Sequence, residues 1–448
     1  MVIFVVLVVL LGLYMAWNIG ANDFANSMAD AVGSGALSLR GAVILGGLCE
    51  FAGSVLVGMF VADTVRMRIV APEHFAAAGG LLPKEAAAMF AMGMACALLA
   101  AAAWLHLATW FGMPVSTTHS IVGAVAGFGM VAVGIRGGFV AGIRVVEWHM
   151  MGGIVASWFL SPVVGLLGAY LVFKAFSWLI LNRANPVVAA IRYAPAVVFS
   201  VVLIVMLSIF YKGGIQRIVC QREAVRLWFT GWRMTAAVVG KCLASALAAK
   251  VLIGRYLRGV DALSVAEQLA YVEKVFAPLV ILTSCSVAFA HGANDVANAI
   301  GPLAAVVDIV KTGTLSLGAV VPLWTLALGG VGIVIGLATY GYRVLRTIGT
   351  KITQLTPSRG VAADFATILV VLVCSRMGLP ISTTHTIVGA ILGVGLARGL
   401  GAVNRKVTRD IFGSWLITVP VSAFMSALFF VIFHFCGVDG LILRLFPQ

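Results

Sequence analysis

Two polar motifs interrupt the apolar sequence of this chain, and each of them occurs twice. Asn and Asp form GANDFAN at residues 20–26 and GANDVAN at residues 292–298, with six of seven positions identical. Ser, Thr and His form PVSTTHSIVGAVAG at residues 114–127 and PISTTHTIVGAILG at residues 380–393, with ten of fourteen positions identical. Such side chains are costly inside hydrocarbon unless they face a cavity, a partner or an ion. The repeated GAND and STTH motifs therefore predict one site that two halves of the chain build together.

The STTH motifs have the residues of an anion site. Gly-x-Pro precedes each Ser-Thr-Thr triplet, and Pro breaks a running helix but suits the start of a new one. We therefore expect each triplet to begin a helix inside the membrane, where protein or water must cover the break. The start of a helix offers unpaired N–H groups and a partial positive charge, which bind oxyanions. The predicted hydroxyl ligands are Ser116, Thr117, Thr118, Ser382, Thr383 and Thr384.

The GAND motifs add carboxylates, which would repel an oxyanion unless a cation or a proton lies between. Na⁺ could be held by Asp23 and Asp295 together with Asn22, Asn294 and freed backbone carbonyls. Alternatively, each Asp accepts a hydrogen bond from a protonated oxyanion or carries the coupling proton itself. Sulfate has no proton to donate at neutral pH, so this second account favours phosphate. The Asn residues could also link helices, since Asn hydrogen-bonds across helices in bilayers.

The composition places these motifs in a membrane protein. The chain has 448 residues, of which 62% are hydrophobic and 10% charged, whereas soluble domains carry about 25% charged residues. We predict an all-α polytopic membrane protein with ten to twelve transmembrane helices, some of them discontinuous or re-entrant. A soluble two-domain enzyme is excluded. Counting spans does not decide whether the two GAND copies point the same way or are inverted.

The formal net charge of +14 does not indicate a nucleic-acid partner. Its Lys and Arg residues lie beside apolar segments, as the positive-inside bias produces at the ends of membrane spans. The seven Cys residues form no CxxC pair, so we predict no disulfide framework, no zinc site and no cofactor. The basic segment at residues 211–233 is predicted to be an amphipathic linker between the halves.

Five further residues are candidates for coupling or for the substrate path. Glu50 lies within an apolar run, so it is a functional candidate unless a polar neighbour pairs with it. Asp364 follows Arg359 by five residues and either pairs with it or lines the path. His119 and His385 follow the Ser-Thr-Thr triplets and are either structural or proton carriers.

The near-constant spacing of the motifs predicts three units. The second copies lie 272 and 266 residues after the first. We predict a first repeat at residues 1–135, middle scaffold helices and the linker at 136–270, and a second repeat at 271–448.

These motifs resemble those of the inorganic phosphate transporter (PiT) family, whose mammalian members are sodium–phosphate symporters. The resemblance extends over nearly the whole chain and includes CEFAGSVLVG at residues 49–58, HGANDVANAIGP at 291–302 and LTPSRGVAADFA at 355–366. It implies inverted repeats, a homodimer and an anion site beside cation sites. That site would combine the hydroxyls named above with Asp23, Asn26, Asp295 and Asn298. Glu50 and Asp364 match family positions that are important for transport.

The sequence departs from the family pattern at two places. Asp30 and Ala31 stand where a small neutral pair such as Gly-Thr is expected, and Asp364 stands where Glu is common. The shorter carboxylate at position 364 bears on the coupling geometry more than on the fold.

We predict a secondary transporter of the plasma membrane that imports inorganic phosphate with Na⁺ by alternating access around a site at the membrane midplane. The alternatives within the family are a sulfate permease and a proton-coupled symporter of metal–phosphate complexes. A passive channel is a third alternative. An intramembrane hydrolase that uses Ser116 or Ser382 with the nearby His is a remote one, because the motif lacks an orienting acid and an oxyanion hole.

Overall fold

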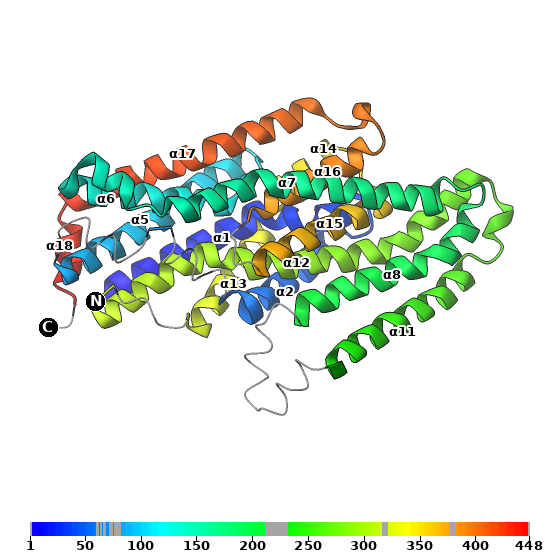
Figure 1. The fold of residues 1–448 in the computed structure, drawn as a ribbon, viewed down its shortest axis with the longest axis horizontal. Helices are drawn as coiled ribbons and strands as arrows, with labels where there is room; N and C mark the ends of the chain where they lie inside the picture. Colours follow the sequence, from blue (N-terminus) through cyan, green and yellow to red (C-terminus); the bar gives the residue numbers. More distant parts are fainter. Residues whose placement is uncertain are drawn as a thin grey trace.

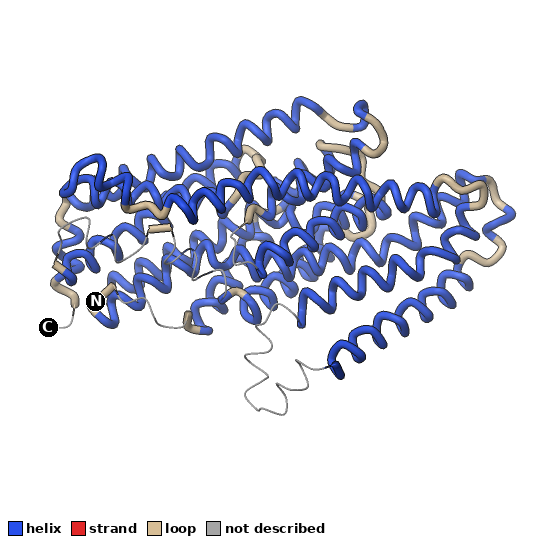
Figure 2. Tube along the Cα trace, in the orientation of Figure 1, coloured by secondary structure: helices blue, strands red, loops and turns tan. Residues whose placement is uncertain are grey.

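The computed structural model describes residues 2–59, 62, 65, 69–70, 75, 82–210, 232–315, 321–376 and 381–446. Within these ranges the chain is helical, and its only β-type pairing is an isolated bridge between Val70 and Val146. Ten helices are long and apolar enough to cross a membrane, or eleven if the bent pair Leu323–Thr339 and Tyr342–Gly349 counts as one span. The long helices lie side by side along the long axis of the molecule (Figures 1 and 2). The predicted all-α membrane architecture is confirmed.

The described helices follow one another along the chain on the two sides of the predicted linker. Before the predicted linker at residues 211–233 lie α1 (Val2–Gly33), α2 (Leu39–Val57), α5 (Pro83–Trp110), α6 (Thr117–Arg144), α7 (Trp148–Phe176) and α8 (Pro186–Phe210). The linker is followed by α11 (Trp232–Tyr256), which begins within its last two residues. The helices after α11 are α12 (Val265–Thr312), α13 (Leu323–Thr339), α14 (Tyr342–Lys351), α15 (Pro357–Arg376), α16 (Thr383–Leu396), α17 (Arg405–Phe435) and α18 (Val438–Leu443). The predicted unit boundaries at residues 135 and 270 fall inside α6 and α12, and the three units stay a prediction. Most of the predicted linker lies outside the described residues.

The GAND motifs lie in the middle of unbroken helices. The sequence places GANDFAN at the end of an apolar run, but α1 continues through it to Gly33, and α12 likewise contains GANDVAN. The helices continue because the polar side chains are buried by neighbouring helices while the backbone keeps its own hydrogen bonds.

α1 and α12 pack against each other in antiparallel orientation. Gly12 faces Leu303, Asp23 lies beside His291, and Asp30 shares the neighbour Gly360 with Val280. Residue numbers thus rise along α1 as they fall along α12. The two GAND copies therefore point in opposite directions, which the span count left open. Inversion of the complete halves stays a prediction.

The STTH motifs begin helices, as predicted. α5 ends at Trp110, Gly112 adopts a left-handed φ of 66°, and α6 begins at Thr117 with Ser116 as its N-cap. α16 begins at Thr383 with Ser382 as its N-cap. The predicted Gly-x-Pro break at residues 378–380 lies outside the described residues.

The glycine of each GAND motif allows a close helix crossing. A Cβ on Gly20 would overlap the carbonyl oxygen of Ile333 in α13, and one on Gly292 would overlap that of Glu50 in α2. α1 of the first half thus packs on α13 of the second, and α12 packs on α2. Small residues permit such an approach between membrane helices.

The helices that follow the STTH motifs pack across the halves in the same way. Gly123 and Gly127 of α6 lie against the backbone of α17, while Gly389 and Gly393 of α16 lie against that of α7. Each half therefore covers helices of the other half. The two STTH motifs also contact each other directly, because Thr118 Oγ1 donates to the Ile381 carbonyl at 3.2 Å.

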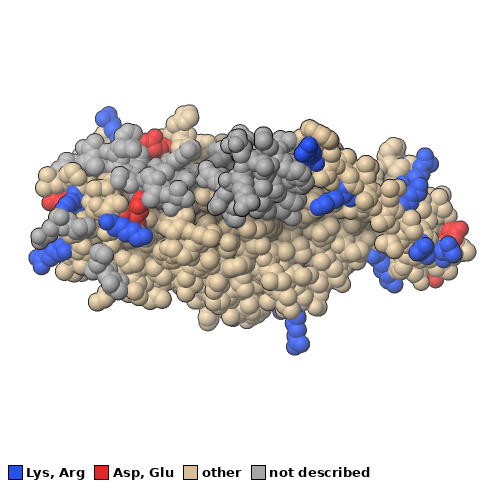
Figure 3. Space-filling view, turned by 90° about the horizontal axis from the view of Figure 1, so that it is seen from below, with Lys and Arg blue, Asp and Glu red and all other residues tan. Residues whose placement is uncertain are grey.

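The outer surface is suited to a bilayer. Large apolar side chains such as Phe159, Leu416 and Phe424 are more than 60% exposed. On the face shown in Figure 3, most Lys and Arg residues lie towards the two ends of the molecule, and the described surface between them is largely uncharged. The chain is a multi-span membrane protein.

Candidate functional site

The carboxylates of the two GAND motifs accept hydrogen bonds from the threonines of the two STTH motifs. Asp23 accepts from Thr117 Oγ1 at 2.9 Å and from Thr384 Oγ1 at 3.2 Å. Asp295 accepts from Thr383 Oγ1 at 2.8 Å. The predicted meeting of all four motifs is therefore present, and each Asp bonds the STTH motif of its own half.

The second Asn of each GAND motif reaches across to the other half. Asn26 Nδ2 donates to Thr384 Oγ1 at 2.8 Å. Asn298 Nδ2 lies 3.2 Å from Thr117 Oγ1 and 3.3 Å from Thr118 Oγ1. These contacts tie the two halves together around the carboxylates, and they repeat with the symmetry of the motifs.

The serines of the STTH motifs cap the helices that begin there. Ser116 Oγ accepts from the backbone N–H of His119, and Ser382 Oγ accepts from that of His385. The first α-helical backbone bond of α6 joins the Ser120 N–H to the Ser116 carbonyl. The N–H groups of Thr117 and Thr118 precede it and belong to the set that a helix start leaves for an anion.

The site is closed to solvent. Each of the ten residues predicted to bind the anion is at most 3% exposed. None of the described Lys or Arg side chains is buried. Among the described residues, the carboxylates of the site therefore have no buried Lys or Arg beside them.

Several amide oxygens of the site are buried without a hydrogen-bond donor. They are the Oδ1 atoms of Asn26, Asn294 and Asn298. Oxygen ligands of this kind suit Na⁺, and they lie on the helices that carry Asp23 and Asp295. A cation beside the carboxylates would satisfy these orphaned acceptors.

Asn22 is less suited to bind a cation than the sequence predicted. Its Nδ2 donates to Thr109 Oγ1 at 2.8 Å and to the Met113 carbonyl at 3.1 Å, while its Oδ1 accepts from the Val115 N–H. Asn22 thus holds the break before α6, which is the helix-linking role that the sequence left open. Asn294 makes a similar bond to the Ile381 carbonyl at 3.3 Å but keeps its own oxygen unpartnered.

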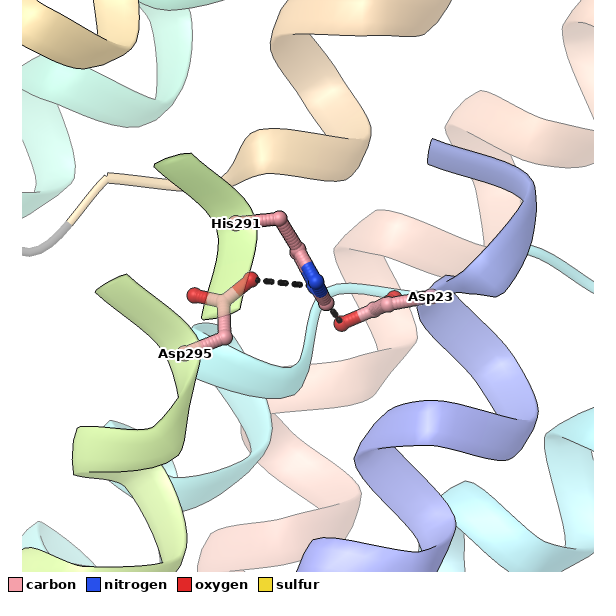
Figure 4. Close-up of side chains that lie close together, drawn as sticks. All are labelled: Asp23, His291 and Asp295. Carbon is pink, nitrogen blue, oxygen red and sulfur yellow. Dashed lines mark ion pairs between the residues drawn. The ribbon is translucent and has the colours of Figure 1, made fainter. Parts of the chain in front are cut away.

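His291 is a central residue that the motif comparison did not single out. Its Nε2 lies 2.8 Å from Asp295 Oδ2 and 3.5 Å from Asp23 Oδ2 (Figure 4). Its Nδ1 lies 3.3 Å from Glu50 Oε1. None of these contacts is aligned as a hydrogen bond. Donor atoms of Asp23, His291 and Asp295 also lie within 4.8 Å of one another, a spacing that could hold a metal ion.

The comparison of copies passed over His291 because Ile19 occupies the matching position of the first copy. The sequence did contain one signal for His291, because it is a histidine within apolar sequence that directly precedes a GAND motif.

Glu50 belongs to the same buried group. Its Oε1 accepts from Ser27 Oγ at 2.9 Å and faces His291, and its side chain is fully buried. The packing of Gly292 on Glu50 brings α2 close enough for this contact. The side chain of His291 therefore lies between Glu50 and the two aspartates, Asp23 and Asp295.

Asp364 and Arg359 lie apart from each other. Asp364 Oδ2 accepts from Thr283 Oγ1 at 2.8 Å and from Ser284 Oγ at 2.7 Å. Its carboxyl group also contacts that of Asp30, whose two oxygens accept no hydrogen bond. Arg359 instead donates to the Gln354 carbonyl at 2.7 Å. The predicted ion pair between Arg359 and Asp364, one of the two interpretations of their spacing, is therefore wrong.

His119 and His385 stack on tryptophans. Their ring centroids are 4.3 Å apart, His119 packs on Trp158 at 3.8 Å, and His385 packs on Trp415 at 3.6 Å. No contact joins either ring to Asp23 or Asp295 among the interactions of the described residues. This packing favours a structural role for His119 and His385 over a role as proton carriers.

Comparison with known proteins agrees with this architecture. The model of the phosphate transporter family matches residues 19–426. A protein of Pyrococcus abyssi named "Putative phosphate permease" is 42% identical over 96% of this chain and 98% of its own length. The "Inorganic phosphate transporter 2-1, chloroplastic" of Arabidopsis thaliana is 41% identical over 95% of this chain and 71% of its own.

A solved structure shows the same fold. The structure named "The sodium-dependent phosphate transporter" is 38% identical, with a TM-score of 0.81 over 96% of this chain and 99% of that chain. All these names describe transporters and permeases rather than enzymes. This chain therefore belongs to the phosphate transporter family.

Proposed function

We propose that this protein imports inorganic phosphate together with Na⁺, by alternating access around the four motifs. The observation that carries the proposal is the meeting of two helix starts, their hydroxyls and two carboxylates in one buried group. The similar solved structure is named as that of a sodium-dependent transporter, which supports the choice of cation.

The charge of the site favours a cation as the second substrate. Asp23, Asp295 and Glu50 surround one histidine, and no described Lys or Arg is buried with them. Phosphate would add one to two negative charges. Two like charges 4 Å apart repel by about 4 kcal/mol at an effective dielectric constant of 20. Na⁺ bound by the carboxylates and the orphaned amide oxygens would remove this repulsion before the anion moves.

The helix starts would bind the anion without a buried Lys or Arg. The N–H groups at the beginning of α6 and α16 and the hydroxyls of the STTH motifs all donate hydrogen bonds. A protonated phosphate oxygen could in turn donate to Asp23 or Asp295. Sulfate lacks that proton at neutral pH, so the same geometry favours phosphate over sulfate.

Closure of the site supports alternating access. In this structure the threonine hydroxyls bond to the aspartates, and the whole group is buried. Phosphate must therefore separate the STTH motifs from the aspartates in order to bind. Because α6 packs on α17 and α16 packs on α7, these pairs would move together when the site opens to either side.

The hydrolase alternative lacks the contacts that catalysis needs. Ser116 Oγ accepts from a backbone N–H, and neither ring nitrogen of His119 makes a hydrogen bond. A serine nucleophile requires a base that takes its proton. Together with the family, this removes the remote alternative.

Uptake into proteoliposomes under separately imposed gradients tests the proposal. We expect labelled phosphate to accumulate with an inward Na⁺ gradient and to stay at equilibrium with an inward proton gradient alone. Excess sulfate should leave uptake unchanged. Accumulation driven by protons alone would replace Na⁺ with H⁺, and competition by sulfate would favour the sulfate permease. Uptake that never exceeds equilibrium would indicate a channel.

We also propose that the protein acts as a homodimer in the plasma membrane. The resemblance to the PiT family suggests the dimer, and the exposed apolar face of the helices suits contact with lipid or with a second copy. The mass of the purified protein measured by light scattering, after subtraction of detergent, tests the dimer. A single monomeric mass at all protein concentrations would contradict it.

A further inference from the structure

A polar cavity lies at one end of the bundle, away from the four motifs. It has a volume of about 610 Å³ and lies where the end of α7, the start of α15, the end of α16 and the first turns of α12 meet. None of the GAND or STTH residues lines it. The charged residues that line it are Lys174, Arg183, Arg359, Arg398 and Glu273.

The cavity has an excess of positive charge. Four cations face one carboxylate, and that carboxylate is already engaged. Glu273 accepts from the Ser358 N–H at 2.9 Å and from Ser358 Oγ at 2.7 Å, which caps the start of α15. Among the ion pairs between described residues, none includes any of the four cations. Glu273 is therefore the one acidic side chain that lines the cavity against four cations, which leaves an excess of positive charge.

Two of the guanidinium groups are held in place by their neighbours. Arg359 donates to the Gln354 carbonyl and lies 5.9 Å from the ring centroid of Phe173, while its buried Nε has no acceptor. Arg183 lies 5.3 Å from the ring of Trp178. Fixed guanidinium groups match phosphate oxygens better than mobile lysines do, because their donors lie in one plane.

We propose that this cavity binds a phosphate group at the membrane surface. The group belongs either to an anionic lipid headgroup or to free inorganic phosphate, and both offer the same charged oxygens. The position at the helix ends corresponds to the depth of headgroups, where basic pockets between membrane helices bind anionic lipids. The inference is independent of the transport proposal, because the cavity and the four motifs share no residue.

A pair of matched double variants tests the proposal. Arg183→Gln with Arg398→Gln removes two exposed cations of the cavity. Arg192→Gln with Arg405→Gln removes the same charge from positions outside it. Equal elution volumes and equal unfolding temperatures would show that both proteins fold, and Arg398→Gln alone replaces the first variant if it does not.

The lipid arm measures phosphatidylglycerol retained by the full-length protein in native mass spectrometry, with phosphatidylcholine as competitor. The phosphate arm measures labelled inorganic phosphate by equilibrium dialysis, with Asp23→Asn and Asp295→Asn present in every protein so that the central site is the same in all of them. We expect the cavity variant to bind at least about tenfold more weakly in one arm, since hydrogen bonds to charged groups are strong. The control variant should stay within about twofold.

The two arms separate the sources of the phosphate group. A loss confined to phosphatidylglycerol assigns a lipid headgroup, and a loss confined to inorganic phosphate assigns the free anion. Equal binding by the cavity and control variants in both arms would overturn the proposal. Failure of Na⁺-driven uptake would not affect the lipid arm, so the two proposals fail separately.

Discussion

The two halves of the site share a set of matching contacts and differ around it. Thr117 bonds Asp23 as Thr383 bonds Asp295, at 2.9 and 2.8 Å. Asp23 also accepts from Thr384 of the other half at 3.2 Å, whereas Thr118, which matches Thr384, donates to the Ile381 carbonyl instead.

Behind the matching contacts, the first GAND motif follows Ile19 whereas the second follows His291, which lies between both aspartates and Glu50. The symmetric layer of matching contacts can bind a near-tetrahedral anion from two sides. The asymmetric part gathers the carboxyl groups of Asp23, Asp295 and Glu50 around one imidazole, and we infer that this concentration of acidic groups sets the cation requirement.

A second asymmetry lies further along the same helices. Asp30 of α1 contacts Asp364 of α15, and Thr283 and Ser284 donate to Asp364. Both aspartates depart from the pattern expected for the family. Asp30 and Asp364 thus place two further buried carboxyl groups in a region that is separate from the central contacts.

The largest expected effect comes from removing either symmetric carboxylate. Asp23→Asn and Asp295→Asn should each abolish Na⁺-driven phosphate uptake in proteoliposomes. The reason is that the substituted amide lacks the negative charge that would hold the cation and that accepts the bonds from the threonines. Unchanged elution and unfolding temperature would show that the fold survives. Normal transport by either variant would mean that the two halves do not share one site.

Replacing His291 tests whether the asymmetric part matters as much as the symmetric layer. His291→Leu should lower uptake by at least about tenfold, because the imidazole lies between three buried carboxyl groups and leucine offers them no polar partner. Adding Glu50→Gln should recover part of that loss, since it removes one of the carboxylates that faced the imidazole. Additive losses in the double variant would show that the two residues act independently.

Removing the orphaned amide oxygens tests their role as cation ligands. Asn26→Leu and Asn298→Leu should each raise the Na⁺ concentration for half-maximal uptake by about tenfold, because each removes one oxygen ligand. Similar shifts are expected, since the two residues occupy matching places. An effect on the phosphate dependence alone, with the Na⁺ dependence unchanged, would assign both residues to the anion instead.

The smallest effect is expected at the outer aspartate pair. Asp30→Asn should keep uptake within about twofold and should not lower the unfolding temperature, because the amide can donate to Asp364 and one buried carboxyl is removed. Asp410→Asn, at an exposed position beside Arg409, serves as the control. A loss of uptake comparable to that of Asp23→Asn would place Asp30 among the essential residues.

Repetition of polar residues was sufficient to predict the centre of the molecule. Asp23, Asp295 and the Ser-Thr-Thr triplets stand out because the bilayer excludes unpaired polar groups, so their presence in both halves requires a shared environment. Gly-x-Pro before each triplet predicted the helix starts through the missing N–H and fixed φ of proline. The motif resemblance predicted the family.

The sequence by itself determined the all-α membrane fold, the helix starts at Ser116 and Ser382, and the residues of the symmetric layer, because each follows from local backbone chemistry or from hydrophobicity. Only the tertiary structure decided that α1 and α12 run antiparallel, that Asn22 holds a helix break, and that Asp364 contacts Asp30 rather than Arg359. It also placed His291 among three carboxylates. These outcomes depend on how helices distant in sequence cross one another, and the pattern of polar residues along a single helix does not encode that crossing.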